Sequence, residues 1–178
     1  MKRSAPLLAL ICCYYWLFAG CNTPSPENYF DLAVLNCNVM TGFANDGLQR
    51  ELDNPTVKMA EGNNNKAVPM KRKEVIDSKI QFLEANFKKI KQLKETWDTE
   101  DLLRASEALN EYVLPVYKNE YKRLAKLYDT RASKKEIQSL IQSIHDKYYP
   151  GFDELYNKLI TAGKSYAARH NIKVNWGT

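Results

Sequence analysis

Few residues of this chain are of the types that carry out chemistry, and their spacing matches none of the common catalytic or cofactor patterns. The two histidines are His145 and His170, and neither follows a glutamate by three positions, as the ligands of di-iron bundles do. The chain also lacks a Cys-x-x-Cys-His sequence for covalent haem and a Gly-x-Ser-x-Gly sequence for a serine nucleophile. The sequence therefore predicts a protein that is not an enzyme, with no catalytic residue, no metal ligand and no bound cofactor. A noncovalent haem between His145 and a methionine such as Met40 stays open as an alternative.

Tyrosines are the second group with a chemical role to consider, because eight of them lie between residues 112 and 166. A tyrosine ring is apolar and its hydroxyl is polar, so such residues either line a groove for a glycan or peptide or fill the boundary between core and solvent. We expect a groove, if one exists, near Pro115 and Pro150, where two helix kinks would open the packing. The candidate groove residues are Tyr112, Tyr117, Tyr121, Tyr148 and Tyr149.

The N-terminal residues predict export. Lys2 and Arg3 precede twelve unbroken apolar residues, from Leu7 to Phe18. This length is within the range of about 7 to 15 residues for the apolar part of a secretory signal, whereas a transmembrane helix needs about 20. A cleaved signal peptide therefore fits better than a permanent N-terminal helix.

The sequence Leu17-Phe18-Ala19-Gly20-Cys21 ends the apolar run with two small residues before a cysteine. It resembles the lipobox of bacterial lipoproteins, in which the cysteine is diacylated on sulfur and becomes the first residue of the mature chain. We therefore predict that residues 1–20 are removed and that Cys21 carries the lipid, since several acyl chains on one residue give durable membrane attachment. The alternative is ordinary cleavage near Ala19, which leaves Cys21 as a free thiol.

The mature chain has room for one domain. Removal of residues 1–20 takes away two of the 26 basic residues and none of the 21 acidic ones, so the formal charge falls from +5 to +3. This weak charge is unlike the clustered basic surface of a nucleic-acid-binding protein. Residues 21–27 predict a polar, proline-containing tether, and residues 28–178 predict one helical domain. Cys37 then has no internal partner and lies in an apolar stripe, so we expect it to be a buried thiol.

Apolar residues recur at helical spacing along most of this domain. The first stripe, which runs from Phe30 to Leu48, predicts one helix starting at Glu27. Residues 53–68 have no periodicity and predict a long connection. Pro69 then suits the first turn of a second helix that reaches Trp97.

Two longer helices follow. Asp98 or Thr99 is a suitable N-cap for a third helix, which we expect to kink between residues 111 and 115 and to end near Asp129. Ser133-Lys134-Lys135-Glu136 is a capping box that starts a fourth helix, which continues across Pro150 to about residue 170. Ile172, Val174 and Trp176 alternate in the tail and are expected to pack back on the helices. The predicted fold is all-α, an antiparallel four-helix bundle with long, proline-kinked third and fourth helices.

The chain also resembles a family of uncharacterised helical surface lipoproteins of Bacteroidetes and Leptospira. The lipobox, the tether, Asn28-Tyr29-Phe30-Asp31 and Tyr117-Lys118-Asn119-Glu120-Tyr121 carry this resemblance, which covers most of the mature domain in pattern. It brings no known activity or functional residue to transfer. We expect a protein held by Cys21 in the bacterial outer membrane, facing the periplasm or the cell surface, that acts as a non-enzymatic interaction or structural module. Its expected partners are the membrane and an envelope protein or glycan, with no nucleic acid; the alternative is a small-ligand or haem carrier that uses the bundle interior.

Overall fold

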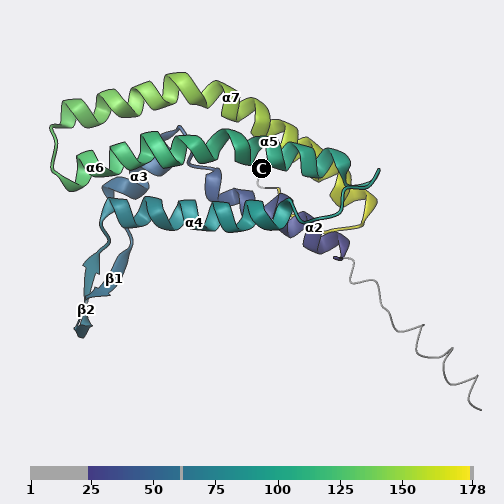
Figure 1. Ribbon diagram of the computed structural model, residues 1–178, viewed down its shortest axis with the longest axis horizontal. Coiled ribbons are helices and arrows are strands. Elements are labelled where there is room, and N and C mark those ends of the chain that lie inside the picture. The colour runs from purple at the N-terminus through teal and green to yellow at the C-terminus, as the bar shows by residue number, and fades with distance from the viewer. Residues whose placement is uncertain (1–23, 61, 177–178) are drawn as a thin grey trace, which may run out of the picture.

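The computed structural model describes residues 24–60 and 62–176, and it shows a mainly α-helical chain with one small two-stranded sheet. The predicted signal peptide, residues 1–20, and the predicted lipid site, Cys21, lie outside these residues. Three long helical segments run side by side in alternating directions, and shorter N-terminal elements pack against them (Figure 1). The prediction of an all-α chain was therefore right for most of the sequence and wrong for the sheet.

The N-terminal stripe does not form one helix. It is divided into the α-helix α2 (Pro26–Ala33), the 3₁₀-helix η2 (Leu35–Met40) and the α-helix α3 (Asp46–Asp53). The chain breaks at Gly42 and Gly47, which approach each other closely. A Cβ atom on Gly42 would lie 2.8 Å from the backbone nitrogen of Leu48, so this approach needs a glycine. Between these glycines Ala44 has a φ of +52°, which ends any right-handed helix. The prediction of burial was nevertheless confirmed: the stripe residues Phe30, Ala33, Cys37, Met40, Ala44 and Leu48 are all buried.

Residues that we predicted to be an irregular connection form a β-hairpin. Strand β1 (Val57–Ala60) pairs antiparallel with strand β2 (Asn63–Pro69), and Gly62 between them has a φ of +74°, which glycine adopts without steric cost. Pro69 ends β2, so its prediction as part of a helix was wrong. Strands of four and seven residues are too short to give a strong periodic signal in the sequence. The hairpin projects away from the helices (Figure 1).

Helix α4 (Arg72–Ile90) ends before Trp97, which we predicted to continue its buried seam. Trp97 lies instead in the connection that follows, and 88% of its surface is exposed. The hydroxyl of Thr99 stabilises this connection, because it accepts a hydrogen bond from the Thr96 nitrogen at 2.9 Å and donates one to the Lys94 carbonyl at 3.2 Å. Local polar contacts therefore stop the helix although its apolar spacing continues.

The third long segment comprises α5 (Glu100–Val116), a π-helical turn η3 (Tyr117–Tyr121) and α6 (Lys122–Asp129). Its predicted end at Asp129 was confirmed. Pro115 lacks the N–H that a regular helix needs, and the chain widens into the π turn directly after it. The side-chain amide of Asn119 donates to the Pro115 carbonyl at 2.9 Å.

The last long helix, α7 (Lys134–Arg169), has the predicted start and end. Ser133 and Glu136 form the capping box, in which the Glu136 nitrogen donates to the Ser133 hydroxyl at 3.2 Å and the Ser133 nitrogen donates to the Glu136 carboxylate at 3.0 Å. The tail packs back as predicted, and the ring of Trp176 meets Phe30 edge to face at 5.7 Å. Among the described residues, no helix is long and apolar enough to cross a membrane.

Candidate binding cleft

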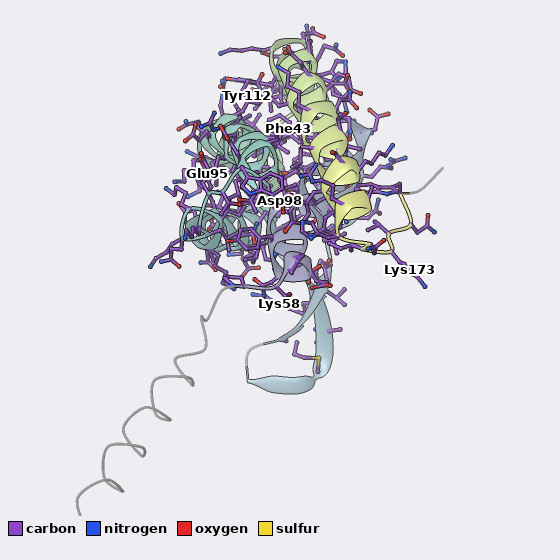
Figure 2. The ribbon with its side chains drawn as sticks, turned by 90° about the vertical axis from the view of Figure 1, so that its right-hand side faces the viewer. Phe43, Lys58, Glu95, Asp98, Tyr112 and Lys173 are labelled. Atoms are coloured by element: carbon purple, nitrogen blue, oxygen red, sulfur yellow. The ribbon has the colours of Figure 1, made fainter. Side chains whose placement is uncertain are left out.

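The structure places the five candidate groove tyrosines in three different environments. Tyr117 and Tyr121 are buried in the core, where their ring centroids lie 5.7 and 5.8 Å from that of Phe43. Tyr112 lies between α5 and α7, close to Phe43 (Figure 2), and its hydroxyl donates to the Tyr148 carbonyl at 3.1 Å. Tyr112 therefore occupies the space beside the proline of α7.

The close packing around Tyr112 follows from a glycine of α7. A Cβ atom on Gly151 would lie 2.6 Å from the Tyr112 hydroxyl, so this approach needs a residue without a side chain. The ring of Tyr148 lies 6.4 Å from that of Tyr112 in an edge-on arrangement. These contacts explain why the two helices stay close where the sequence suggested an opening.

Tyr149 instead lines a surface cleft of about 670 Å³ between the α3 region and α7, and the buried Tyr117 also borders it. We call it the His145 cleft, after the histidine at its edge. Its lining is mostly polar and comes from η2, from the loop before α3, from α3 itself, from α4, from η3 and from α7. The polar and aromatic residues that line it are Asn38, Thr41, Asn45, Asp46, Arg50, Glu51, Lys79, Tyr117, His145 and Tyr149.

Ala44 fixes the loop that forms one wall of this cleft. Its backbone nitrogen donates to the Tyr121 hydroxyl at 2.7 Å, and its carbonyl lies 2.8 Å from Nδ1 of His145. Because a carbonyl oxygen only accepts, this contact places the imidazole proton on Nδ1. Two residues that are distant in the sequence thus hold Ala44 in its left-handed conformation.

The same histidine forms an aromatic pair with Tyr149, one helical turn further along α7. The two rings are nearly parallel, with an interplanar angle of 18° and a centroid distance of 5.1 Å. His145 is exposed and Tyr149 is half-buried, so the stacked pair lies at the edge of the cleft with part of its ring surface accessible. A spacing of four residues puts both rings on one face of the helix.

The charged groups in the cleft balance one another. Glu51 of α3 and Lys79 of α4 form an ion pair at 2.9 Å, and Asp46 and Arg50 add one charge of each sign. The Tyr117 hydroxyl is neutral but buried beneath the cleft, since burial raises its pKa well above the usual value and the nearby Tyr121 and Glu51 add to the effect. The charged groups that line the cleft therefore sum to no net charge, and Glu51 and Lys79 among them are paired with each other.

The Tyr117 hydroxyl is also notable because it is buried and has no hydrogen-bond partner among the described residues. Most buried polar groups are paired, and an unpaired one reduces stability.

A smaller hollow of about 250 Å³, which is lined in part by Tyr121 and Leu124, shares Asn45 and His145 with the His145 cleft. The loop wall thus separates two hollows.

Cys37 is a buried thiol, as predicted. It is 1% exposed, and burial raises its pKa to about 11, although a hydrogen bond with Ser106 opposes the shift. Its sulfur lies 3.2 Å from the Ala33 carbonyl, to which the Ser106 hydroxyl also donates, at 2.9 Å. A thiol in this environment stays protonated at neutral pH and is a poor nucleophile.

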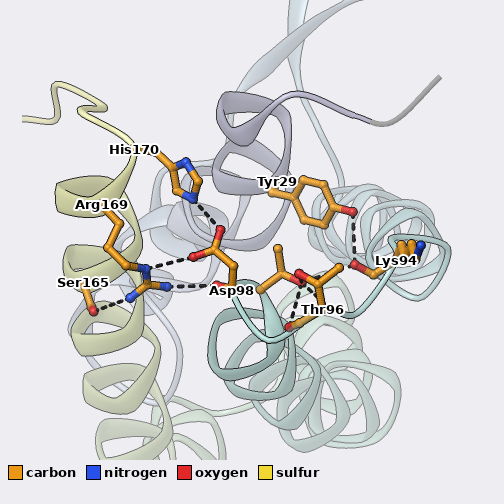
Figure 3. A network of polar contacts seen from close by, with 8 residues as sticks. Tyr29, Lys94, Thr96, Asp98, Ser165, Arg169 and His170 are labelled. Carbon is orange, nitrogen blue, oxygen red and sulfur yellow. Dashed lines mark hydrogen bonds and ion pairs between the residues drawn. The ribbon is translucent and has the colours of Figure 1, made fainter. Parts of the chain in front are cut away.

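The second histidine belongs to a polar cluster at the other end of the molecule (Figure 3). His170 Nε2 lies 2.6 Å from Asp98 Oδ2, and Arg169 Nε donates to Asp98 Oδ1 at 2.9 Å. Burial opposes ionisation of Asp98, but the hydrogen bonds from His170 and Arg169 outweigh it and lower the pKa of this carboxyl. Ser165 accepts a hydrogen bond from Arg169 at 2.7 Å. Ser165 thus binds Arg169, whereas His170 binds Asp98. The cluster connects the end of α7 to the segment before α5.

No family model matches this chain, and comparisons with curated proteins and with solved structures also gave no match. Within the described part of the chain, no group of three or more histidine, cysteine, aspartate or glutamate side chains is placed to hold a metal ion.

Proposed function

We propose that the protein is a lipid-anchored module of the bacterial envelope that binds a neutral oligosaccharide in the His145 cleft, without catalysis. The observation that carries this proposal is the cleft itself, which is open, polar, balanced in charge and edged by the parallel rings of His145 and Tyr149. The anchor and the cleft are separate parts of the proposal and are tested separately.

The N-terminal sequence supports the anchor. Ala19 and Gly20 before Cys21 suit the lipoprotein peptidase, and a prolyl tether then separates the acylated residue from α2. The proposed location is the outer membrane, facing the periplasm or the cell surface. Mass spectrometry of the purified N-terminus is expected to find acylated Cys21 as the first residue. A free thiol on Cys21, or an intact Met1, would contradict the anchor.

We also propose that the helices form a four-helix bundle in which the divided N-terminal segment replaces one helix. α2, η2 and α3 together run along the other three helical segments (Figure 1). Tyr29 of α2 supports this arrangement, because its hydroxyl donates to the Lys94 carbonyl at 3.1 Å. The break between η2 and α3 is what shapes the cleft, so the binding site depends on the irregular helix.

The chemistry of the cleft favours a sugar over an anion. A sugar ring has hydroxyl groups at its rim and C–H groups on its faces, so it needs hydrogen-bonding groups together with a flat apolar surface. Asn38 and Asn45 offer amide donors and acceptors, and Glu51 offers a carboxylate acceptor. The His145 and Tyr149 rings offer the flat surface. Because Lys79 is paired with Glu51, a phosphate group would have to disrupt an ion pair to bind there.

The alternative, a haem or small-ligand carrier, needs space between the helices. The interior positions are filled by side chains such as Phe43, Leu48 and Tyr117, which have no exposed surface or almost none. Met40 is fully buried, and His145 uses Nδ1 to bind the Ala44 carbonyl. A visible absorption spectrum of the purified protein separates the two functions, because a haem carrier would show a Soret band.

Binding is tested with a panel of neutral malto-, manno- and chito-oligosaccharides, measured by calorimetric titration of the full-length protein. We expect Tyr149→Ala to weaken binding of the best ligand at least tenfold. Tyr156→Ala is the matched control, because Tyr156 is also half-buried on α7 and stacks on Phe152 at 5.4 Å but lies outside the cleft lining. The absence of binding to the whole panel, or an equal loss in both variants, would reject the proposal.

A further inference from the structure

One face of the β-hairpin is apolar and exposed. In the antiparallel pair Val57 is opposite Pro69 and Met59 is opposite Ala67. Directly opposite residues point to the same side of a sheet, and so do residues two positions apart on one strand. Val57 is 59% exposed and Met59 is 53% exposed, and Ala67 and Pro69 are also exposed. These four residues form what we call the hairpin face.

The rest of the hairpin is held to the helical body. Lys58 points to the other side of the sheet, and its Nζ atom forms an ion pair at 2.5 Å with Glu74 of α4. At the base of the hairpin the Met70 nitrogen donates to the Thr56 carbonyl at 2.9 Å. These contacts set the direction in which the hairpin projects, so the exposure of its apolar face is a fixed feature of the fold.

The hairpin and the start of the domain lie on the same side of the molecule. In two perpendicular views the hairpin extends beyond the helices, and α2 lies on that side of α5 and α7 (Figures 1 and 2). Five peptide units separate Cys21 from Pro26, and an extended chain of this length spans at most about 17 Å. A lipid on Cys21 therefore keeps the start of α2 within about 17 Å of the leaflet. The hairpin lies at the opposite end of α4 on the same side of the molecule, so it would be a second contact point (Figure 1). The seven residues of β2 extend over about 23 Å, at about 3.3 Å per residue.

Charge and area both favour a membrane as the occupant of this face. Lys71 at the base of α4 is exposed, and basic residues near the surface are attracted to anionic lipid. Lys66 of β2 is also exposed, but it precedes Ala67 and so lies on the other side of the sheet from the hairpin face. Glu74, an acidic residue at the base of the hairpin, is paired with Lys58. Four small or medium side chains cover far less than the roughly 800 Å² per partner of a stable protein interface. A bilayer needs no complementary shape, so a small apolar face is sufficient.

We propose that the hairpin face inserts into the headgroup region of an anionic leaflet, the same leaflet that holds the acyl chains of Cys21. This inference rests on the proposed lipid anchor and is independent of sugar binding in the cleft. The protein would then contact the membrane at two points, its tether and its hairpin. These two contacts would fix the orientation of the domain relative to the membrane. The cleft would be held in one orientation instead of rotating freely about the tether.

The test places an environment-sensitive dye at residue 59 of the full-length, membrane-purified protein. Met59→Cys is labelled with a thiol-reactive nitrobenzoxadiazole dye, and Cys37 does not interfere because it is buried and protonated. The protein is reconstituted into phosphatidylcholine vesicles with and without 25% phosphatidylglycerol. Quenching by a nitroxide lipid is measured, and mass spectrometry of the same sample reports acylation of Cys21. Ser143→Cys on the exposed surface of α7 is the matched control.

We expect at least threefold stronger quenching at residue 59 than at residue 143 in the anionic vesicles, and a loss of this difference when Val57→Asp is added. Acylated Cys21 with an unquenched dye at residue 59 would overturn the hairpin proposal and leave the anchor intact. Unacylated Cys21 would overturn both. Dye–dye contact between copies that rises with protein concentration would overturn the proposal in favour of a second copy of the chain as the occupant.

Discussion

Replacement of Tyr121 by phenylalanine should destabilise the protein, whereas the same replacement at Tyr117 should not. Both rings are buried and both pack against Phe43, so the two changes remove the same atom from nearly the same environment. The hydroxyls differ in their partners. That of Tyr121 accepts a 2.7 Å hydrogen bond from the Ala44 nitrogen, and that of Tyr117 has no partner among the described residues.

The magnitude follows from what each change leaves behind. Tyr121→Phe leaves the buried Ala44 N–H unpaired, which costs about 1–3 kcal/mol of the free energy of unfolding. Tyr117→Phe removes a hydroxyl that is already unpaired, so we expect it to be neutral or to stabilise by up to about 1–3 kcal/mol. The two variants should therefore differ by at least about 1 kcal/mol, or roughly 2–4 °C in Tm for a domain of this size.

The assay is urea unfolding of the full-length protein and of both variants, followed by circular dichroism and by intrinsic fluorescence. Coincident transitions from the two probes would justify a two-state treatment. Equal stability of Tyr121→Phe and the parent would show that the Tyr121 hydroxyl does not hold the cleft loop. A loss of more than about 1 kcal/mol in Tyr117→Phe would show that the Tyr117 hydroxyl makes a stabilising interaction in the folded protein.

Three further predictions concern other parts of the fold. Asp98→Asn should lower stability at pH 7, because the lowered pKa of Asp98 stabilises the folded state above its unfolded pKa. This contribution starts to fall below about pH 4, the ordinary pKa of an aspartate, and is lost as the pH falls through the folded pKa, so the difference between the two proteins should shrink over that range. Cys37 should react with a thiol reagent at pH 8 only after unfolding, since its pKa is raised to about 11. Gly42→Ala should destabilise by about 1–3 kcal/mol in thermal melts, because the new Cβ atom would lie 2.8 Å from the Leu48 nitrogen.

Each of these predictions has a result that would contradict it. For Asp98, the contradiction is a constant difference in stability between pH 7 and pH 3. For Cys37, it is stoichiometric labelling of the folded protein at the rate of a free thiol. For Gly42, it is an unchanged melting temperature, which would mean that the loop before α3 does not need this close backbone approach.

Local signals explain which parts of the fold could be predicted from the sequence. Ser133 and Glu136 are three residues apart, so their reciprocal hydrogen bonds can be recognised from the sequence alone, and α7 starts where they predict. The end of α6 at Asp129 follows from a helical pattern that continues through Pro115. In both cases the determining contacts lie within one or two turns of the residues concerned.

One part that was predicted wrongly depends on contacts between distant residues. The left-handed Ala44 is held by Tyr121 and His145, which are 77 and 101 residues away in the sequence. The apolar spacing around it is compatible with a continuous helix, and only the tertiary contacts show that the helix is divided. The hairpin was missed for a different reason, because strands of four and seven residues give too short a periodic signal.

Contacts between distant residues also explain why the candidate site was predictable only in part. Tyr149 and Tyr117 were named from the tyrosine pattern, and both line the His145 cleft. Asn45, Glu51 and Lys79 were missed, because they come from the loop before α3, from α3 and from α4, and no spacing in the sequence connects them. A site assembled from several elements becomes visible when the chain is folded.

The most direct test of the proposed function is amide chemical-shift mapping by NMR, with the neutral oligosaccharide that binds best in the calorimetric panel. The largest shifts are expected at residues 44–47 and 145–149, in the loop wall and the aromatic edge of the His145 cleft, with small shifts in the hairpin and around Asp98. Shifts that are largest elsewhere, or the absence of saturable shifts for every neutral oligosaccharide in the panel, would contradict the proposal that this cleft is a sugar-binding site.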